Sequence, residues 1–404
     1  MRQVDYCLLR ANTPLLCTAV DPVQLARYNG AIACRVKRMK TVFLFILPML
    51  IIGGTNVSAD GTDKKADLRD VVGSTHTSGK YNFTDQDFLN EGADKLLELG
   101  TRVIKLWFTP NPAGSYPFNS KWPEIKSLVD LAKTPYFREV FAKPFTTYIF
   151  EAFAPGHGWH YFAGGMTPEQ IAEERNQVYE LAKYLLTEYK GTGKTFILQN
   201  WEGDWVLTNP KFTKEPDPVT VQGMIDWLNA RQDGVERARQ EVGTKGVMVL
   251  HAAEVNLVAR AMEGKVTVTN DVLPNTHCDL YSYSAWDTMR DPKKFREALD
   301  YLAKKAPDSK LFGNRNVYVG EFGAPENNVG GPEKQLEIIK SAVETALDWG
   351  ARYVVYWELY CNEKAHEYEG RPKNSDCRGF WLIRPDGTKS LVWDYFAGLF
   401  KGKG

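Results

Sequence analysis

Short apolar segments alternate with longer amphipathic segments along the chain from residue 70 onward. The short segments are rich in Val, Ile, Phe and Tyr, as β-strands are, and each ends in polar or aromatic residues. These predicted strands lie at residues 70–75, 102–108, 146–153, 195–200, 247–251, 279–284, 316–321 and 352–357. The longer segments have helical spacing of their apolar residues. The predicted helices lie at residues 85–99, 168–189, 219–242, 292–305 and 332–349.

Strands that alternate with helices predict parallel pairing with right-handed crossovers, and eight repeats favour a closed barrel over an open sheet. The expected fold class is therefore α/β, a single (β/α)8 TIM barrel. The sequence RPDGT at residues 384–388 predicts a small C-terminal hairpin before a last helix that ends near Phe400. The glycine fingerprints of dinucleotide sites and P-loops are missing from the sequence, which argues against both classes.

The first 60 residues have a different organisation. Residues 41–52 form an apolar run that is too short to span a bilayer comfortably, with four basic residues before it and small residues after it. This order is typical of a secretory signal peptide, predicted at residues 39–59, whereas a buried core helix is the alternative. We expect residues 1–38 to be an extension from a start codon assigned upstream of Met39. The catalytic barrel domain would then span residues 60–404, and the protein would be secreted or periplasmic.

The chain carries 50 basic and 50 acidic residues, so its charge favours neither nucleic acid nor an anionic membrane as a partner. Six histidines and the absence of a CxxC pattern predict no metal site, and no cofactor is expected. In an exported protein, Cys361 and Cys377 are a candidate disulfide, because they flank a polar segment that contains Gly and Pro. The alternative is two unpaired thiols. The composition gives no indication of the oligomeric state.

Two glutamates are the main candidates for chemistry. In a (β/α)8 barrel the active site lies at the carboxyl ends of the strands, where Glu202 follows the fourth strand and Glu321 closes the seventh. Two carboxylates across one pocket fit the cleavage of a glycosidic bond, which requires protonation of the leaving group and stabilisation of an oxocarbenium-like carbon. Asp204 and Glu254 are rival candidates for these roles, and each glutamate alone could be a solvated loop residue.

This arrangement resembles the clan A superfamily of retaining (β/α)8-barrel glycoside hydrolases, over residues 67 to about 400. The resemblance rests on the two glutamates, on Trp357 at the end of the eighth strand and on a tyrosine near the end of the sixth. It implies Glu202 as the general acid/base and Glu321 as the nucleophile. It also implies that Tyr283 or Tyr281 donates a hydrogen bond to the nucleophile, and that Trp357 forms the floor under the sugar.

The sequence departs from that family at two places. Trp201 stands between Asn200 and Glu202, where the family usually has Asn directly before the acid/base, and Lys105 replaces a frequent arginine on the second strand. Residues two apart in a strand share a face, so Asn200 and Glu202 are still expected to point inward together, with Asn200 binding a sugar hydroxyl.

Tryptophans gather at or just past the predicted strand ends, and indoles at a barrel mouth fit stacking against carbohydrate. Packing under the loops is the alternative for about half of them. The predicted substrate-binding residues therefore also include Trp107, Trp201, Trp205 and, at the end of the fifth strand, His251.

The favoured interpretation is a secreted glycoside hydrolase that cleaves O-glycosidic bonds of an oligo- or polysaccharide by a retaining mechanism. A non-catalytic secreted carbohydrate-binding barrel is one alternative. A barrel lyase or isomerase that uses Lys105 or His251 together with a carboxylate is another.

Overall fold

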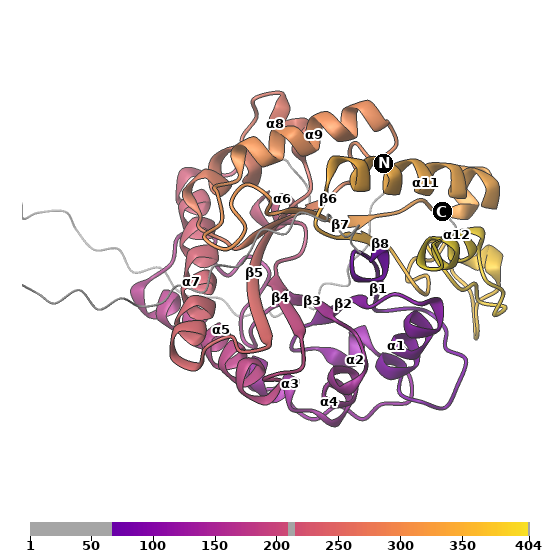
Figure 1. Ribbon diagram of the computed structural model, residues 1–404, viewed down its shortest axis with the longest axis horizontal. Coiled ribbons are helices and arrows are strands. Elements are labelled where there is room, and N and C mark those ends of the chain that lie inside the picture. The colour runs from indigo at the N-terminus through magenta and orange to yellow at the C-terminus, as the bar shows by residue number, and fades with distance from the viewer. Residues whose placement is uncertain (1–66, 209–214, 403–404) are drawn as a thin grey trace, which may run out of the picture. The chain divides into compact units, whose positions relative to one another are not determined.

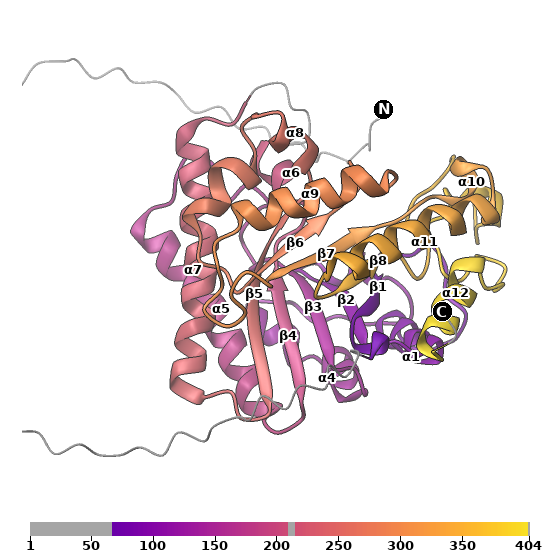
Figure 2. The same cartoon turned by 45° about the horizontal axis from the view of Figure 1, so that its top comes forward.

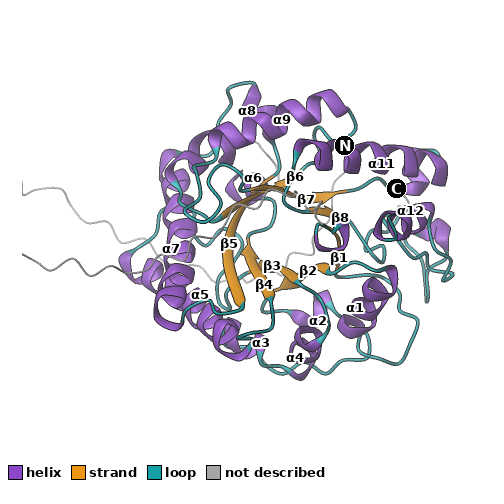
Figure 3. Cartoon of the chain, in the orientation of Figure 1, coloured by secondary structure: helices purple, strands orange, loops and turns teal. Residues whose placement is uncertain are grey.

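The computed structural model describes residues 67–208 and 215–402, so the predicted extension at 1–38 and signal peptide at 39–59 lie outside the described residues. Eight parallel strands pair in chain order, and β8 pairs with β1 to close the barrel. The strands form the inner ring and the helices surround them (Figures 1 and 3). The predicted (β/α)8 barrel is confirmed.

The strands fall where the apolar segments predicted them. They are β1 Val72–His76, β2 Val103–Phe108, β3 Thr147–Ala152, β4 Lys194–Gln199, β5 Val247–Val255, β6 Leu280–Ser284, β7 Val317–Phe322 and β8 Val354–Tyr356. The largest difference is at β5, which continues four residues beyond its predicted end. Glu254 therefore lies within a strand, where its side chain has a fixed direction, and not in the loop after it.

The long helices are also those that the sequence predicted. They are α1 Phe88–Leu99, α5 Pro168–Glu188, α7 Pro218–Val242, α9 Pro292–Lys305, α11 Pro332–Trp349 and α12 Leu391–Phe400. Short helices that have too few residues for a periodic signal lie in the connections: α2 Pro112–Ser115, α3 Leu128–Ala132, α4 Pro135–Ala142, α6 Gly203–Thr208, α8 Val258–Met262 and α10 Glu326–Val329. The predicted hairpin precedes α12, with Arg384 N donating to Thr388 O at 2.9 Å.

The barrel interior has an apolar layer and a polar layer. The apolar layer is made by inward-facing residues of the strands: Val103, Ile149, Ile197, Leu250, Ala252, Leu280, Tyr318 and Val355. Two residues further along β2, β3, β4, β5 and β6, the same face carries Lys105, Glu151, Gln199, Glu254 and Ser282, all completely or almost completely buried. The apolar layer fills the barrel, as in other barrels of this class, and the polar layer above it lies toward the carboxyl ends of the strands.

Helices α5 and α7 lie side by side over β4 and β5 (Figure 2). Arg231 of α7 and Glu174 of α5 form a fully buried ion pair at 3.1 Å between these helices. Arg231 also donates to the Gln199 carbonyl oxygen at 3.4 Å, and this contact connects the helix pair to the end of β4. Within the described residues, none of the helices has the length and apolar character needed to cross a membrane.

Candidate active site

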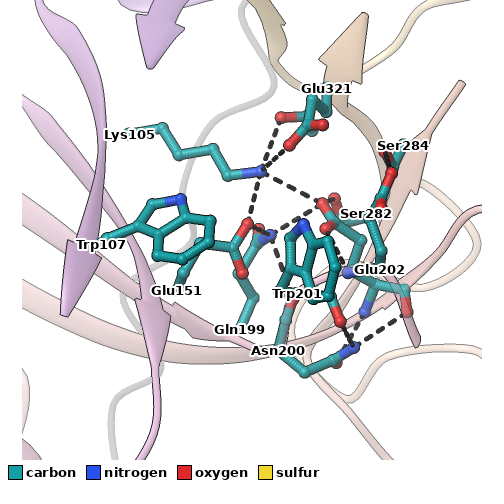
Figure 4. A network of polar contacts seen from close by, with 12 residues as sticks. Lys105, Trp107, Glu151, Gln199, Asn200, Trp201, Glu202, Ser282, Ser284 and Glu321 are labelled. Carbon is teal, nitrogen blue, oxygen red and sulfur yellow. Dashed lines mark hydrogen bonds and ion pairs between the residues drawn. The ribbon is translucent and has the colours of Figure 1, made fainter. Parts of the chain in front are cut away.

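A single buried ammonium group lies at the centre of the polar layer. Lys105 Nζ is 2.6 Å from Glu151, 3.4 Å from Glu254 and 3.2 Å from Glu321, and it donates to the Gly320 carbonyl oxygen at 3.1 Å. Figure 4 shows this lysine between carboxylates that come from different strands. Burial acts to lower the pKa of Lys105, but the three carboxylates together raise it well above its usual value. The lysine is therefore a fixed positive charge and has no free amine for a Schiff base.

The three carboxylates around this lysine also have the spacing of a metal site, with one oxygen from each of Glu151, Glu254 and Glu321 within 4.8 Å of the others. The Lys105 ammonium occupies the position from which a cation would contact them all. The donor set is thus satisfied by a side chain of the protein, and the cluster does not fit a metal ion.

The carboxylate of Glu254 accepts hydrogen bonds from four donors. Its Oε2 accepts from Gln199 Nε2 at 2.7 Å, from Ser282 Oγ at 2.7 Å and from Lys105 at 3.4 Å. Its Oε1 accepts from the backbone N–H of Glu202 at 3.0 Å. The carboxylate with these four donors lies below the pocket and positions the peptide of Glu202. The geometry therefore does not favour Glu254 as a rival catalytic acid.

Glu202 is held in an unusual backbone conformation directly after β4. Its φ is +27°, a region that residues other than glycine rarely adopt, and such outliers cluster at functional sites. Ser284 Oγ at the end of β6 donates to Glu202 Oε1 at 3.0 Å. Burial first, and then the negative charges of Glu321 and Glu254, raise the pKa of Glu202 well above its usual value. These surroundings favour the protonated form of Glu202.

Glu321 is directed into the same site by an irregularity in β7. In that strand Tyr318 belongs to the interior layer and Phe322 packs on the outer side. The strand register shifts between Val319 and Phe322, which lets Glu321 reach Lys105 at 3.2 Å although strict alternation would turn it outward.

Two donors stabilise the charged form of the Glu321 carboxylate, whose pKa is raised above its usual value. Trp286 Nε1 donates to Glu321 Oε1 at 2.9 Å, and Lys105 contacts Oε2. Burial raises the pKa of Glu321, and Lys105 is the largest opposing influence, followed by Trp286 among the hydrogen bonds. The two glutamates thus have different environments, with a protonated form favoured at Glu202 and an ionised form supported at Glu321.

Asn200 does not have the role that was expected of it. Its Oδ1 accepts from Glu254 N at 2.9 Å and its Nδ2 donates to Glu254 O at 3.1 Å. Both ends of the amide are therefore used to join the ends of β4 and β5, and the predicted contact with a sugar hydroxyl is wrong. The inserted Trp201 is half-buried, and its ring lies 6.3 Å from that of Trp107 at the barrel mouth.

Asp204 is a structural residue of the loops around the site. Its carboxylate accepts hydrogen bonds from the backbone N–H groups of Asn256, Leu257 and Val268, at 3.0, 3.1 and 2.8 Å. Both oxygens of this buried carboxylate accept from backbone donors, so the side chain fixes the segment after β5 and leaves no oxygen facing a substrate. Trp205, on α6 next to it, is half-buried.

The predicted tyrosine donors face away from the barrel interior. Tyr283 OH contacts Asp287 and Thr288, and Tyr281 OH contacts Thr276, so the expected hydrogen bond from either tyrosine to Glu321 is wrong. The two tyrosines do share a face, but it is the outer face of β6.

The inner face of β6 carries serines instead, and Trp286 takes the place of the expected tyrosine as donor to Glu321. In the sequence, the feature that points to Trp286 is its position two residues after Ser284, just past the end of the sixth strand.

His251 also lies on the outer side of the barrel. It is completely buried, and Arg231 Nε donates to its Nε2 at 3.3 Å. Burial, followed by the charge of Arg231, lowers the pKa of His251 well below its usual value, so it is a neutral acceptor. The prediction that His251 binds substrate is wrong, because odd and even residues of β5 face opposite sides.

Trp357 follows β8 and is 6% exposed. Cys361 and Cys377, which lie beyond it, are both buried and free, and their side chains lie within hydrogen-bonding reach of each other. The two cysteines are neighbours, as the candidate disulfide requires, but both are free thiols in the structure.

Comparisons with known proteins provide the fold context. No protein-family model matches the sequence, and no curated protein matches it. Among solved structures, GH5_18 from Streptomyces cattleya in complex with Manβ1-4GlcNAc has a TM-score of 0.52 at 15% identity, covering 82% of this chain and 80% of that chain. The exo-β-1,4-mannosidase Op5Man5 from Opitutaceae bacterium strain TAV5 has a TM-score of 0.52 at 13% identity, covering 82% and 59%.

A broad-specificity GH5-4 endoglucanase from Clostridium acetobutylicum has a TM-score of 0.50 at 11% identity, covering 82% of this chain and 97% of that chain. The expected resemblance thus holds at the level of architecture. The chain has the (β/α)8 fold of these three solved structures.

Proposed function

We propose that this protein is a retaining glycoside hydrolase that cleaves O-glycosidic bonds of an oligo- or polysaccharide, with Glu202 as general acid/base and Glu321 as nucleophile. The observation that carries the proposal is the pair itself. Two buried carboxylates at the ends of β4 and β7 interact electrostatically. Burial raises the pKa of both, well above the usual value at Glu202, whereas Lys105 and Trp286 stabilise the charged form of Glu321.

The proposed reaction has two steps. In the first, Glu321 attacks the anomeric carbon while Glu202 transfers its proton to the oxygen of the leaving group, so that the glycosidic bond breaks and a glycosyl ester forms on Glu321. In the second, Glu202, now ionised, removes a proton from a water molecule whose oxygen attacks the same carbon and releases Glu321. The second step returns the proton to Glu202 and the negative charge to Glu321. The released sugar keeps the anomeric configuration that it had in the substrate.

The surrounding charges support this exchange. When Glu202 gives up its proton, Glu321 loses its negative charge to the ester, so the total charge beside Lys105 is unchanged. The buried ammonium therefore faces a constant number of negative charges through the first step, which limits the electrostatic cost in a site of low dielectric constant. Ser284 stabilises the ionised form of Glu202 that the second step requires.

The test is turnover on a panel of aryl glycosides and polysaccharides, beginning with β-mannosides and β-glucans because the fold neighbours named above act on or bind such sugars. Glu202→Gln and Glu321→Ala should each lower kcat by at least about a thousandfold. Azide should restore turnover of Glu321→Ala, because it can replace the missing nucleophile. Unchanged turnover in both variants would contradict the proposal, and binding without cleavage by the wild type would indicate a non-catalytic carbohydrate-binding barrel.

Export is part of the same proposal. The segment 39–59 has the features of a signal peptide, and export would bring the enzyme to polysaccharides outside the cell. Expression from Met39 with the natural host's export machinery, followed by N-terminal sequencing, should give a mature chain that begins near Asp60. Recovery of the protein from inside the cell, with residues 39–59 still attached, would contradict export.

A further inference from the structure

A cavity of about 270 Å³ lies at the barrel mouth, beside the proposed catalytic pair. It is formed by the end of β2 and by the segments that follow β1, β2 and β3. Its lining residues are Ser78, Trp107, Thr109, Pro110, Asn111, Gly114, Ser115, Phe153, His157 and Trp159. Pockets for drug-sized ligands begin at about 300 Å³, so this one suits a single ring with its substituents. Aromatic walls with a few hydroxyl and amide groups match the apolar faces and polar edge of a sugar.

The cavity is next to the cleavage position but does not contain it, since neither Glu202 nor Glu321 lines it. The Trp107 and Trp159 rings in its wall lie 6.3 and 5.2 Å from the ring of Trp201, the residue that directly precedes Glu202. Figure 4 shows the Trp107 and Trp201 indoles beside the carboxylate network. A ring bound in the cavity is therefore separated from the catalytic pair by the width of these side chains.

One wall residue has an unsatisfied donor. Trp107 Nε1 is buried and has no hydrogen-bond partner among the described residues. A buried indole N–H usually finds a partner, and leaving it without one costs free energy. Because this nitrogen is buried, Trp107 offers a ligand in the cavity its ring and not its N–H.

The segment that carries Trp159 is held in place before any ligand binds. His157 Nδ1 lies 3.0 Å from Glu174 Oε2, and the His157 ring stacks on Tyr161 at 3.6 Å. Glu174 in turn pairs with the buried Arg231. Trp159 is nevertheless 38% exposed, which is unusual for so large an apolar side chain on a fastened segment. A rigid exposed indole is a binding platform that loses little conformational entropy on contact.

We propose that this cavity is a subsite for one additional sugar ring of the substrate, with Trp159 as its stacking platform. The proposal rests on the function proposed above and makes it more specific, because an enzyme with such a subsite acts on oligosaccharides and polysaccharides in preference to single glycosides.

The experiment compares Trp159→Ala with Trp159→Phe on manno- and cello-oligosaccharides of two to five rings and on the matching aryl monoglycosides. Trp159→Ala should lower kcat/KM for the oligosaccharides by about tenfold, mainly through KM, and change the value for aryl monoglycosides by less than about twofold. Trp159→Phe keeps an aromatic face and should recover most of the loss. Leu311→Ala, at a similarly exposed apolar side chain, is the control and should behave as the wild type.

An equal loss on both substrate types, or no loss on either, would overturn the subsite. A binding measurement separates this outcome from failure of the proposed chemistry: Glu321→Ala, with and without Trp159→Ala, is titrated with the same oligosaccharides by isothermal titration calorimetry. Tighter binding of four rings than of one, lost with Trp159→Ala, supports the subsite even if Glu202→Gln and Glu321→Ala keep their turnover and the proposed mechanism fails. Binding that does not depend on Trp159 overturns the subsite even if both glutamates prove essential.

Discussion

The carboxylate of Glu254 accepts the backbone N–H of Glu202 at 3.0 Å, and thereby holds the proposed acid/base in a left-handed backbone conformation. Asn200 also joins the ends of β4 and β5, because its side-chain amide forms hydrogen bonds with both the N–H and the carbonyl oxygen of Glu254. Glu254 is thus a positioning residue that acts on the reaction through the peptide of Glu202.

Glu254→Gln should lower kcat strongly while the barrel stays folded. The amide has the shape of the carboxylate but cannot accept from Gln199, Ser282 and the Glu202 peptide together, so Glu202 should lose its fixed position. Hydrogen bonds to charged groups contribute about 1.5–3 kcal/mol, which corresponds to a loss of roughly tenfold to a hundredfold. Steady-state kinetics with circular dichroism measure the effect, and Glu297→Gln on the exposed side of α9 is the control. A normal kcat would contradict the positioning role.

The eight strands were predictable because burial on both faces makes each one a short apolar run, and the long helices were predictable from their periodicity. The direction of individual side chains at the strand ends was not. Serine and tyrosine alternate along β6, and the sequence does not show which of the two faces points inward. The outward direction of Tyr281 and Tyr283 is therefore visible only in the structure. Glu321 was placed correctly at its strand end, but the bulge that turns it inward has no sequence signal.

Ser284→Ala should move the alkaline limb of the pH profile to higher pH. The Ser284 hydroxyl stabilises the ionised form of Glu202 and so lowers its pKa, which burial has raised well above the usual value. Without this donor the pKa rises further, and Glu202 keeps the proton needed for the first step at higher pH. The profile of kcat/KM against pH measures the shift as a property of the coupled pair. A limb that stays in place or moves to lower pH would show that Ser284 does not act on the general acid.

Trp286→Phe should move the acidic limb, also to higher pH. Activity requires an ionised Glu321 and falls as pH decreases through its pKa, which is raised by burial. The indole N–H lowers that pKa, so its removal raises it and the enzyme becomes inactive at a higher pH than the wild type. The phenyl ring keeps most of the packing against Phe380. Comparison of both limbs in Ser284→Ala and Trp286→Phe assigns each limb to one glutamate, and movement of the same limb in both variants would contradict the assignment.

Lys105→Met should destabilise the protein by about 3–5 kcal/mol, because the lysine is the shared counter-ion of three buried carboxylates. The pH dependence has a definite sign. The folded pKa of Lys105 is raised above the unfolded value, so its contribution is complete below the ordinary lysine pKa and disappears as pH rises through the folded pKa. The wild type should therefore lose stability in strong alkali, whereas Lys105→Met should not show this loss. Denaturant unfolding between neutral and alkaline pH measures both effects, and equal alkaline slopes would contradict the assignment.

Gly203→Ala tests how tightly the segment after Glu202 is packed against β5. A Cβ at Gly203 would lie 2.3 Å from the Glu254 carbonyl oxygen, and that oxygen belongs to the backbone and cannot rotate away. The segment would have to shift by more than half an ångström, at a cost of about 1–3 kcal/mol, and the Glu202 carboxyl would shift with it. Gly398→Ala in α12 is the matched control: nothing lies within 4 Å of its added methyl, and alanine is the better helix former by up to about 1 kcal/mol. The unfolding temperature and kcat should therefore both be lower in Gly203→Ala than in the wild type. Gly398→Ala should be at least as stable as the wild type. If Gly203→Ala kept full activity, the position of Glu202 would not depend on its close contact with β5.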